Sequence, residues 1–382
     1  MTVVYAANPP GGPALHALVV GVGHYPKFPE PGLPSAARSA VAFAKWLIEE
    51  FNLPSTPLGS VELLLTPPPV GPEGPDPSAR WANQAVDPAT IDNFVAAVGE
   101  LTPGSNGWLH RASSHEDNIA LVYFCGHGLQ KGTVSSLLFQ DFDANPLLAN
   151  RFSNALNLSS FAEGMERCLA RRQFFAIDAC RSLPSWLYGY NGSLGQDVIA
   201  PDFDSQPVNP RRCAVLRSTA PSQASYGDPV GLSRFTQALL YALNGPAAND
   251  RFNPHGEWEV WSDDFPKVLE RLANTGVLPW RWGASPPMYD VSASFVLHVP
   301  RDPKVPVLVT CNPPADNLHA SLRLVDPLGE TEFGTRGPAA SQWVYDLKLV
   351  EFCAEAAFVN GNAPRRSVAR RAIPPCMLVS LE

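Results

Sequence analysis

Long apolar runs are missing from this sequence of 382 residues. Runs such as Ile119–Cys125 cover only about a third of the ~20 residues that a membrane helix needs, so no membrane segment is expected. Residues 1–10 lack the basic start and the long apolar stretch of a secretory signal. The formal net charge is −8, and Lys and Arg form no block beyond short pairs such as Arg211-Arg212. These absences argue against membrane and nucleic-acid partners.

Paired cysteines and metal-binding motifs are missing as well. The seven cysteines show no CxxC spacing, which is typical of reduced thiols in a cytoplasmic protein. The eight histidines form no HExxH motif, so no metal site is predicted. Gly21-Val22-Gly23 follows an apolar run, but no third glycine and no P-loop lysine come after it, so no nucleotide cofactor is expected.

Short apolar runs alternate with helix-period segments over the first 300 residues, which is typical of a mostly parallel sheet with helices on both faces. Strands are predicted at 15–22, 61–65, 119–125, 173–177 and 213–216, and helices at 36–51, 88–101, 160–169, 233–242 and 265–272. Asp87 and Ser160 are the expected N-caps of the second and third helices. The 40 prolines cluster between the predicted elements, where loops are expected.

The pattern changes after residue 300, where strand-like runs follow one another without an amphipathic helix. These runs lie at 305–310, 320–325, 343–350 and 376–381. We therefore predict an α/β domain over 1–300 and a small, β-rich, sandwich-like domain over 301–382. The second domain either recruits a substrate or partner or only packs against the first, and the sequence does not decide between these roles.

Two of the predicted strands end in reactive side chains. The run Ile119–Cys125 is followed by His127, and the run Gln173–Ile177 is followed by Cys180. Because the carboxyl ends of neighbouring parallel strands lie at one edge of a sheet, the imidazole and the thiol can meet there. A histidine that takes the thiol proton creates a thiolate nucleophile.

The glycines on both sides of His127 leave room for a peptide carbonyl to approach the backbone. The amide N–H groups of Gly128 and Cys180 could then donate to the oxyanion that forms. The structural alternatives are a small core cysteine and a histidine in a turn. Cys125 lies within its apolar run and is interpreted as a core residue.

The two segments resemble the histidine and cysteine motifs of the caspase-like cysteine peptidases, a group that includes caspases, metacaspases and bacterial CHAT-type proteases. The motifs are Phe124-Cys125-Gly126-His127-Gly128 and Asp178-Ala179-Cys180-Arg181-Ser182, and the cysteine follows the histidine by 53 positions. The resemblance covers roughly residues 15–300 and implies a caspase-like (hemoglobinase) fold and thiol protease activity on proteins or peptides. It implies Cys180 as nucleophile, His127 as general base, and a substrate cleft lined by Ser225, Tyr226 and Gly227.

Asp178 stands two residues before the predicted nucleophile, as in metacaspases, which the resemblance links to cleavage after Arg or Lys. In an extended strand both side chains point to one side, about 6.6 Å apart, so the carboxylate could bind an arginine beside the attacked carbonyl. Cleavage after Arg, with Lys as the second choice, is therefore predicted. The alternative is that Asp178 caps a helix or orients the loop.

The resemblance also indicates a zymogen that is activated by cleavage of the loop after the cysteine. Arg211 and Arg212 end that loop and are candidate cleavage sites, although the pair could equally be a solvated strand entry. Kinship alone suggests a bacterial antiviral defence or cell-death cascade with an upstream activating protease. No organic cofactor is implied; some relatives depend on calcium, which the sequence neither requires nor excludes. The alternative function is a catalytically silent caspase-like scaffold that binds a protein partner.

Overall fold

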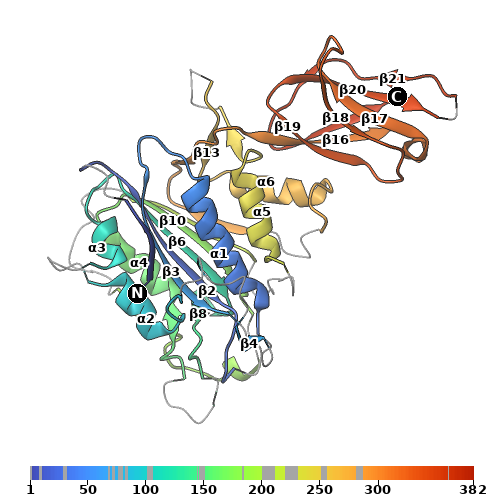
Figure 1. The fold of residues 1–382 in the computed structure, drawn as a ribbon. Coiled ribbons are helices and arrows are strands. Elements are labelled where there is room, and N and C mark those ends of the chain that lie inside the picture. Colours follow the sequence, from blue (N-terminus) through green and yellow to red (C-terminus); the bar gives the residue numbers. More distant parts are fainter. Residues whose placement is uncertain are drawn as a thin grey trace. The chain divides into compact units, whose positions relative to one another are not determined.

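A seven-stranded sheet forms the centre of the fold (Figure 1). The computed structural model describes residues 2–7, 11–28, 32–67, 69–70, 74–75, 81, 85–100, 106–143, 145, 151–182, 185–199, 211–219, 231–250, 256–280, 287–359 and 361–382. The chain divides into a first unit over 1–240 and 284–295 and a second unit over 241–283 and 296–382. The predicted domain boundary at residue 300 stays a prediction.

The sheet has the order β1-β3-β2-β6-β10-β11-β14. Its strands are β1 (Thr2–Ala6), β2 (Leu15–Val22), β3 (Leu58–Thr66), β6 (Ile119–Gly126), β10 (Arg172–Ala179), β11 (Arg212–Arg217) and β14 (Met288–Val291). The five inner strands are parallel, and β1 and β14 are antiparallel to their neighbours. After β2 the chain goes to β3 on one side, whereas β6 lies on the other side of β2, so the strand order reverses between β2 and β6.

Helices cover both faces of this sheet, which explains why its inner strands are apolar without alternation. Helix α1 (Pro34–Glu49) packs on one face, where Phe43 stacks on Tyr123 with ring centroids 4.5 Å apart. Tyr123 also hydrogen-bonds Thr236 of α5 (Arg234–Leu243) on that face. Helices α2 (Ile91–Val98), α3 (Trp108–Ala112) and α4 (Leu158–Gly164) share one core with the other face (Figure 1). The α/β fold class is therefore confirmed.

The predicted starts of two helices were wrong. Helix α2 begins after Thr90, whose side chain accepts the Asn93 N–H, because Asp87 instead exchanges hydrogen bonds with Thr2 of β1. Helix α4 begins after Asn157, which accepts the Ser160 N–H. Leu169, the last residue of the helix predicted over 160–169, lies beyond α4 and is exposed.

A small antiparallel sheet follows the main strand β6 directly. It consists of β7 (Gly128–Lys131), β8 (Val134–Leu138) and β9 (Ala155–Asn157). Residues 185–199 extend it, because the Gln196 N–H donates to Ala155 and the Gln196 carbonyl accepts from Asn157. The segment that follows the predicted nucleophile is thus held against this sheet.

The second unit is rich in strands, as the alternation of its sequence predicts. Its elements include β12 (Ala248–Asn249), β13 (Glu259–Trp261), α6 (Phe265–Asn274), β15 (Val296–His298), β16 (Lys304–Cys311), β17 (Ala320–Val325), β18 (Glu332–Arg336), β19 (Trp343–Lys348), β20 (Glu351–Phe358), β21 (Arg365–Arg366), β22 (Arg370–Arg371) and β23 (Met377–Leu381). The sheets β19-β16-β23 and β18-β17-β20-β21 bury a common core. In the part of the chain that the structure describes, no helix is both long and apolar enough to cross a membrane.

Candidate active site

His127 and Cys180 lie side by side at the carboxyl edge of the main sheet. Gly126 of β6 is the register partner of Ala179 of β10, and beyond the two residues Leu129 bridges Ser182 in parallel. Both pairings have the same offset, so the register places His127 opposite Cys180. Neighbouring strands lie about 4.8 Å apart, which is close enough for the two side chains to meet.

The glycines beside His127 make room for other groups of the chain. A Cβ at Gly126 would lie 2.6 Å from the Tyr25 hydroxyl, and a Cβ at Gly128 would lie 2.6 Å from the Cys180 carbonyl oxygen. The absent side chains let the loop after β2 and the segment of Cys180 approach His127. That the glycines also admit a substrate carbonyl stays a prediction.

Tyr25 and Phe28 form the surroundings of the His127 ring. The ring centroid of Tyr25 lies 4.8 Å from that of His127, and the centroid of Phe28 lies 5.3 Å from it. Burial raises the pKa of Tyr25 well above its usual value, although the hydrogen bond from the His127 backbone acts against this. A negative charge on the sulfur of Cys125 or Cys180 would raise the pKa of Tyr25 further.

Asp178 is buried below the nucleophile position, with only 2% of its surface exposed. Its Oδ2 atom accepts hydrogen bonds from Ser233 Oγ, from Thr236 Oγ1 at 3.1 Å and from Cys125 Sγ at 3.4 Å. Ser233 is also the N-cap of α5, since its Oγ accepts the Thr236 N–H. The carboxylate therefore connects the end of β10 to the start of α5 through side-chain hydroxyl groups.

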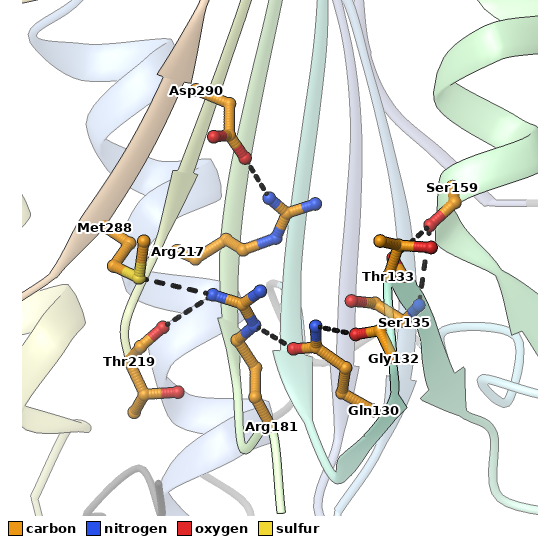
Figure 2. A network of polar contacts seen from close by, with 10 residues as sticks. All are labelled: Gln130, Gly132, Thr133, Ser135, Ser159, Arg181, Arg217, Thr219, Met288 and Asp290. Atoms are coloured by element: carbon orange, nitrogen blue, oxygen red, sulfur yellow. Dashed lines mark hydrogen bonds and ion pairs between the residues drawn. The ribbon is translucent and has the colours of Figure 1, made fainter. Parts of the chain in front are cut away.

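Arg181, the residue after the predicted nucleophile, contacts three other segments of the chain (Figure 2). Its Nε donates to Gln130 Oε1 at 2.6 Å, and its NH1 contacts the Thr219 carbonyl at 3.4 Å and Met288 Sδ at 3.5 Å. Burial lowers the pKa of Arg181, and the nearby Arg217 charge lowers it further. These bonds fix the segment of Cys180 between β7 and the end of β11.

The predicted activation pair lies at the start of β11. The Arg212 N–H donates to the Arg171 carbonyl at 2.7 Å, and the Arg211 carbonyl accepts from Ser292 Oγ at 2.9 Å. Both sides of the peptide bond between the two arginines are therefore hydrogen-bonded within the sheet. Ser225, Tyr226 and Gly227, the predicted cleft residues, lie outside the described residues.

The sheet carries a second histidine and a second cysteine that do not form such a pair. His16 of β2 is the register partner of Ala120, which lies five positions before Cys125 on β6. Five residues of strand span about 16 Å, so His16 and Cys125 are at different heights in the sheet. Burial raises the pKa of Cys125, and the Asp178 charge raises it further, which keeps its thiol protonated.

Tyr25 and Arg181 are the residues of this edge that the sequence patterns did not single out. Tyr25 contacts His127 from 102 positions away along the chain, and no local spacing reports such a contact. Arg181 is part of the quoted cysteine motif, but its partners Gln130 and Thr219 come from other strands. The one sequence signal for Arg181 is its position directly after the predicted nucleophile Cys180.

Comparison with known proteins links the chain to one family. A model of the caspase domain matches residues 15–255. The chain is 30% identical over 265 residues to a probable protease of a Desulfuromonadales bacterium, which covers 68% of this chain and 28% of that protein. It is 25% identical over 210 residues to an uncharacterized protein of Sinorhizobium fredii, which covers 52% of each. The match thus spans about a quarter to a half of the length of these relatives.

Two solved structures are similar to this chain. One is a protein of Geobacter sulfurreducens, with a TM-score of 0.43 and 13% identity, covering 74% of this chain and 94% of that one. The other is caspase-1 of Spodoptera frugiperda, with a TM-score of 0.36 and 11% identity, covering 73% of this chain and 87% of that one.

Proposed function

This chain belongs to the caspase domain family, and we propose that it is a cysteine endopeptidase in which Cys180 is the nucleophile and His127 the general base. The observation that carries the proposal is the strand register, in which the pairs 126/179 and 129/182 enclose the pair 127/180. A thiol needs a proton acceptor within hydrogen-bond reach to become a strong nucleophile. His127 is positioned to be that acceptor.

The proposed reaction begins when His127 takes the proton of the Cys180 thiol. The thiolate attacks the substrate carbonyl carbon, and the negative charge moves to the carbonyl oxygen, where the Gly128 and Cys180 N–H groups could donate to it. Collapse of this intermediate breaks the C–N bond, and the departing amine takes the proton from His127. A water molecule that His127 deprotonates then hydrolyses the thioester and frees Cys180. No step requires a metal ion or an organic cofactor, so we expect turnover with a chelator present.

Turnover of a reporter peptide tests this function. We expect the wild-type chain to hydrolyse an arginyl peptide, and both Cys180→Ala and His127→Ala to lose turnover by about 10³-fold or more. Cys213→Ala is the matched control, since Cys213 is also a partly exposed thiol but lies in β11. If neither the intact chain nor a chain cut after Arg211 or Arg212 turns over any peptide in a mixed library, the chain is a binding scaffold instead.

We further propose that the substrate residue before the cleaved bond is Arg, with Lys second. The support is the Asp178 carboxylate two residues before Cys180, because a carboxylate binds a guanidinium in bidentate fashion. Its present donors are Ser233, Thr236 and Cys125, so an arginine would have to join or replace these hydroxyl and thiol groups. The resemblance to metacaspases supports the same specificity.

The variant Asp178→Asn separates recognition from a structural role. If Asp178 binds the substrate, the variant should lose at least about tenfold in its preference for an arginyl over a glutaminyl peptide, mainly through KM. If Asp178 only orients α5, all peptides should be affected equally and the melting temperature should fall. An unchanged arginine preference would refute the proposed recognition.

Processing and biological role are proposals that rest on kinship. Cleavage after Arg211 or Arg212, by this enzyme or by an upstream protease, requires the start of β11 to open first because of its backbone hydrogen bonds. Intact mass measured during turnover, with Arg211→Gln/Arg212→Gln as comparison, tests whether cleavage is needed. A role in bacterial antiviral defence is tested by phage challenge of cells that carry the wild type or Cys180→Ala.

A further inference from the structure

We propose that Tyr25 is a positioning residue for the general base, and that its hydroxyl and ring together with Phe28 hold the His127 imidazole toward Cys180. This inference rests on the proposed function of His127 and adds a residue to it. Tyr25 lies on the loop after β2, and His127 follows β6. The strand order reverses between these two strands, so the loops that leave them diverge and open the edge of the sheet at this point.

The hydroxyl of Tyr25 fixes the backbone of His127. It accepts the His127 N–H at 2.7 Å and donates to the Leu138 carbonyl of β8 at 3.2 Å. Both partners are main-chain groups, and Tyr25 is only 4% exposed. A buried hydroxyl with a donor and an acceptor in fixed positions has one favourable orientation, so the loop after β2, the end of β6 and strand β8 are held in one arrangement.

The rings of Tyr25 and Phe28 fix the side chain of His127. Their planes are inclined at 54° and 64° to the imidazole, with centroid distances of 4.8 and 5.3 Å. Phe28 is itself supported by an edge contact with Phe142, with ring centroids 5.4 Å apart. These are favourable aromatic geometries, and rings at this distance also attract the positive charge that the imidazole carries after it takes the thiol proton.

Gly126 gives an independent indication that the hydroxyl contact matters. A Cβ at this position would lie 2.6 Å from Tyr25 Oη, closer than real Cβ contacts allow. The next atom that such a Cβ would meet belongs to the Phe124 ring, at 3.0 Å. The glycine before His127 therefore admits the tyrosine hydroxyl to the backbone of the general base.

The test compares Tyr25→Phe, which removes only the hydroxyl, with Phe28→Leu, which removes one ring. We expect kcat to fall about tenfold or more in each variant while KM stays within about twofold, because misplacing a reacting group lowers kcat. Tyr345→Phe is the matched control, since its hydroxyl also donates to a main-chain carbonyl, that of Phe333, in the second unit. A merely stabilising Tyr25 would lower the melting temperature and leave kcat unchanged, which would overturn the proposal.

Alkylation of Cys180 by iodoacetamide provides a second readout that does not depend on turnover. Its rate is followed by mass spectrometry between pH 5 and 9, with His127→Ala as reference and Cys180→Ala as blank. We expect the pH profile of Tyr25→Phe to move toward that of His127→Ala. If the wild type fails to cleave peptides but this shift appears, the proposed function is wrong and the positioning role stands. If the wild type cleaves and the Tyr25→Phe profile equals the wild-type one, the positioning role is wrong.

Discussion

His16 lies in β2 and His127 directly follows the neighbouring strand β6, yet the surroundings of the two histidines differ. His16 lies inside β2 near its start, is 7% exposed, and its Nδ1 lies 2.9 Å from Ser60 Oγ. His127 follows the last residue of β6 and is partly exposed beside the Cys180 segment. A ring within a strand is surrounded by its neighbours, whereas a ring after a strand end can reach a substrate.

Each of the two histidines has a glycine and an arginine in its neighbourhood. Near His16, Gly59 leaves room for the ring, and Arg111 pairs with the fully buried Glu62. Near His127, Gly126 leaves room for the Tyr25 hydroxyl, and Arg181 follows Cys180. The same residue types thus pack in the core at one place in the sheet and surround the proposed catalytic pair at the other, and the difference lies in their position relative to the strand ends.

The strongest test of this comparison replaces each of the two histidines in a separate variant. We expect His127→Ala to lower kcat by about 10³-fold with little change in melting temperature, because a general base contributes 10²- to 10⁴-fold. His16→Asn should have the opposite effect, lowering the melting temperature and leaving kcat unchanged, since His16 is packed in the core. Peptide turnover and thermal unfolding of both variants check this, and a loss of kcat in His16→Asn at full stability would break the comparison.

The inner strands could be predicted from the sequence because helices bury both faces of the sheet, and this leaves unbroken apolar runs. The placement of His127 and Cys180 at one edge could be predicted for the same reason, since side chains that follow such runs lie at the carboxyl edge of the sheet. The segment 343–350, however, is predicted as one strand, whereas β19 ends at Lys348 and two further residues reverse the chain before β20. A two-residue reversal without Gly or Pro leaves no mark in the apolar pattern.

The features that could not be predicted depend on contacts between distant segments. Asp87 has the properties of an N-cap, but its hydrogen bonds with Thr2, 85 residues away, place the start of α2 at Thr90. Asp178 likewise receives its bond from Ser233, 55 residues away. Local spacing describes how a residue relates to its own helix or strand, and it carries no information on which distant donor reaches a carboxylate.

The pH dependence of stability tests the His16 surroundings directly. Burial lowers the pKa of His16 to about 4, and the charge of Arg111 contributes to this shift. Between pH 4 and 6.5 the unfolded chain therefore binds more protons than the folded chain, so the free energy of unfolding rises with pH in this range. Burial raises the pKa of Glu62 to about 7, although the charge and hydrogen bond of Arg111 act to lower it. Between pH 4.5 and 7 the folded chain therefore binds more protons than the unfolded chain, so the free energy of unfolding falls with pH in this range. Each shift corresponds to about 3 kcal/mol, and the two contributions nearly cancel in the wild type.

Single variants should reveal the two slopes. As the pH rises from 4.5 to 7, the free energy of unfolding of Glu62→Gln should increase relative to the wild type. As the pH rises from 4 to 6.5, the free energy of unfolding of His16→Asn should decrease relative to the wild type. Urea unfolding at several pH values measures the difference from the wild type, in which the contributions of all other groups cancel. Equal pH profiles of wild type and both variants would show that neither group titrates differently in the folded chain.

The two glycines offer a comparison of smaller size. A Cβ at Gly59 would lie 2.7 Å from His16 Cε1, so Gly59→Ala should cost about 1–3 kcal/mol in the free energy of unfolding, as overpacked cores do, with kcat preserved. Gly126→Ala pushes on Tyr25 Oη and should lower kcat by about tenfold. Denaturant unfolding and turnover are measured on both. A loss of stability alone in Gly126→Ala would remove the distinction between the two places.

The smallest expected effects come from the two arginines. Arg181 binds an amide oxygen, a carbonyl oxygen and a thioether with two of its nitrogens, and a lysine cannot reproduce this planar fork. Arg181→Lys keeps the charge and should lower kcat/KM by about fivefold to tenfold, because the segment of Cys180 loses part of its support. Arg111→Lys keeps an ion pair with Glu62 and should leave kcat/KM unchanged. Both variants preserve the charge of the chain, so a difference in kcat/KM between them reports the geometry at the carboxyl edge. Equal kcat/KM values would mean that Arg181 supports the fold as Arg111 does.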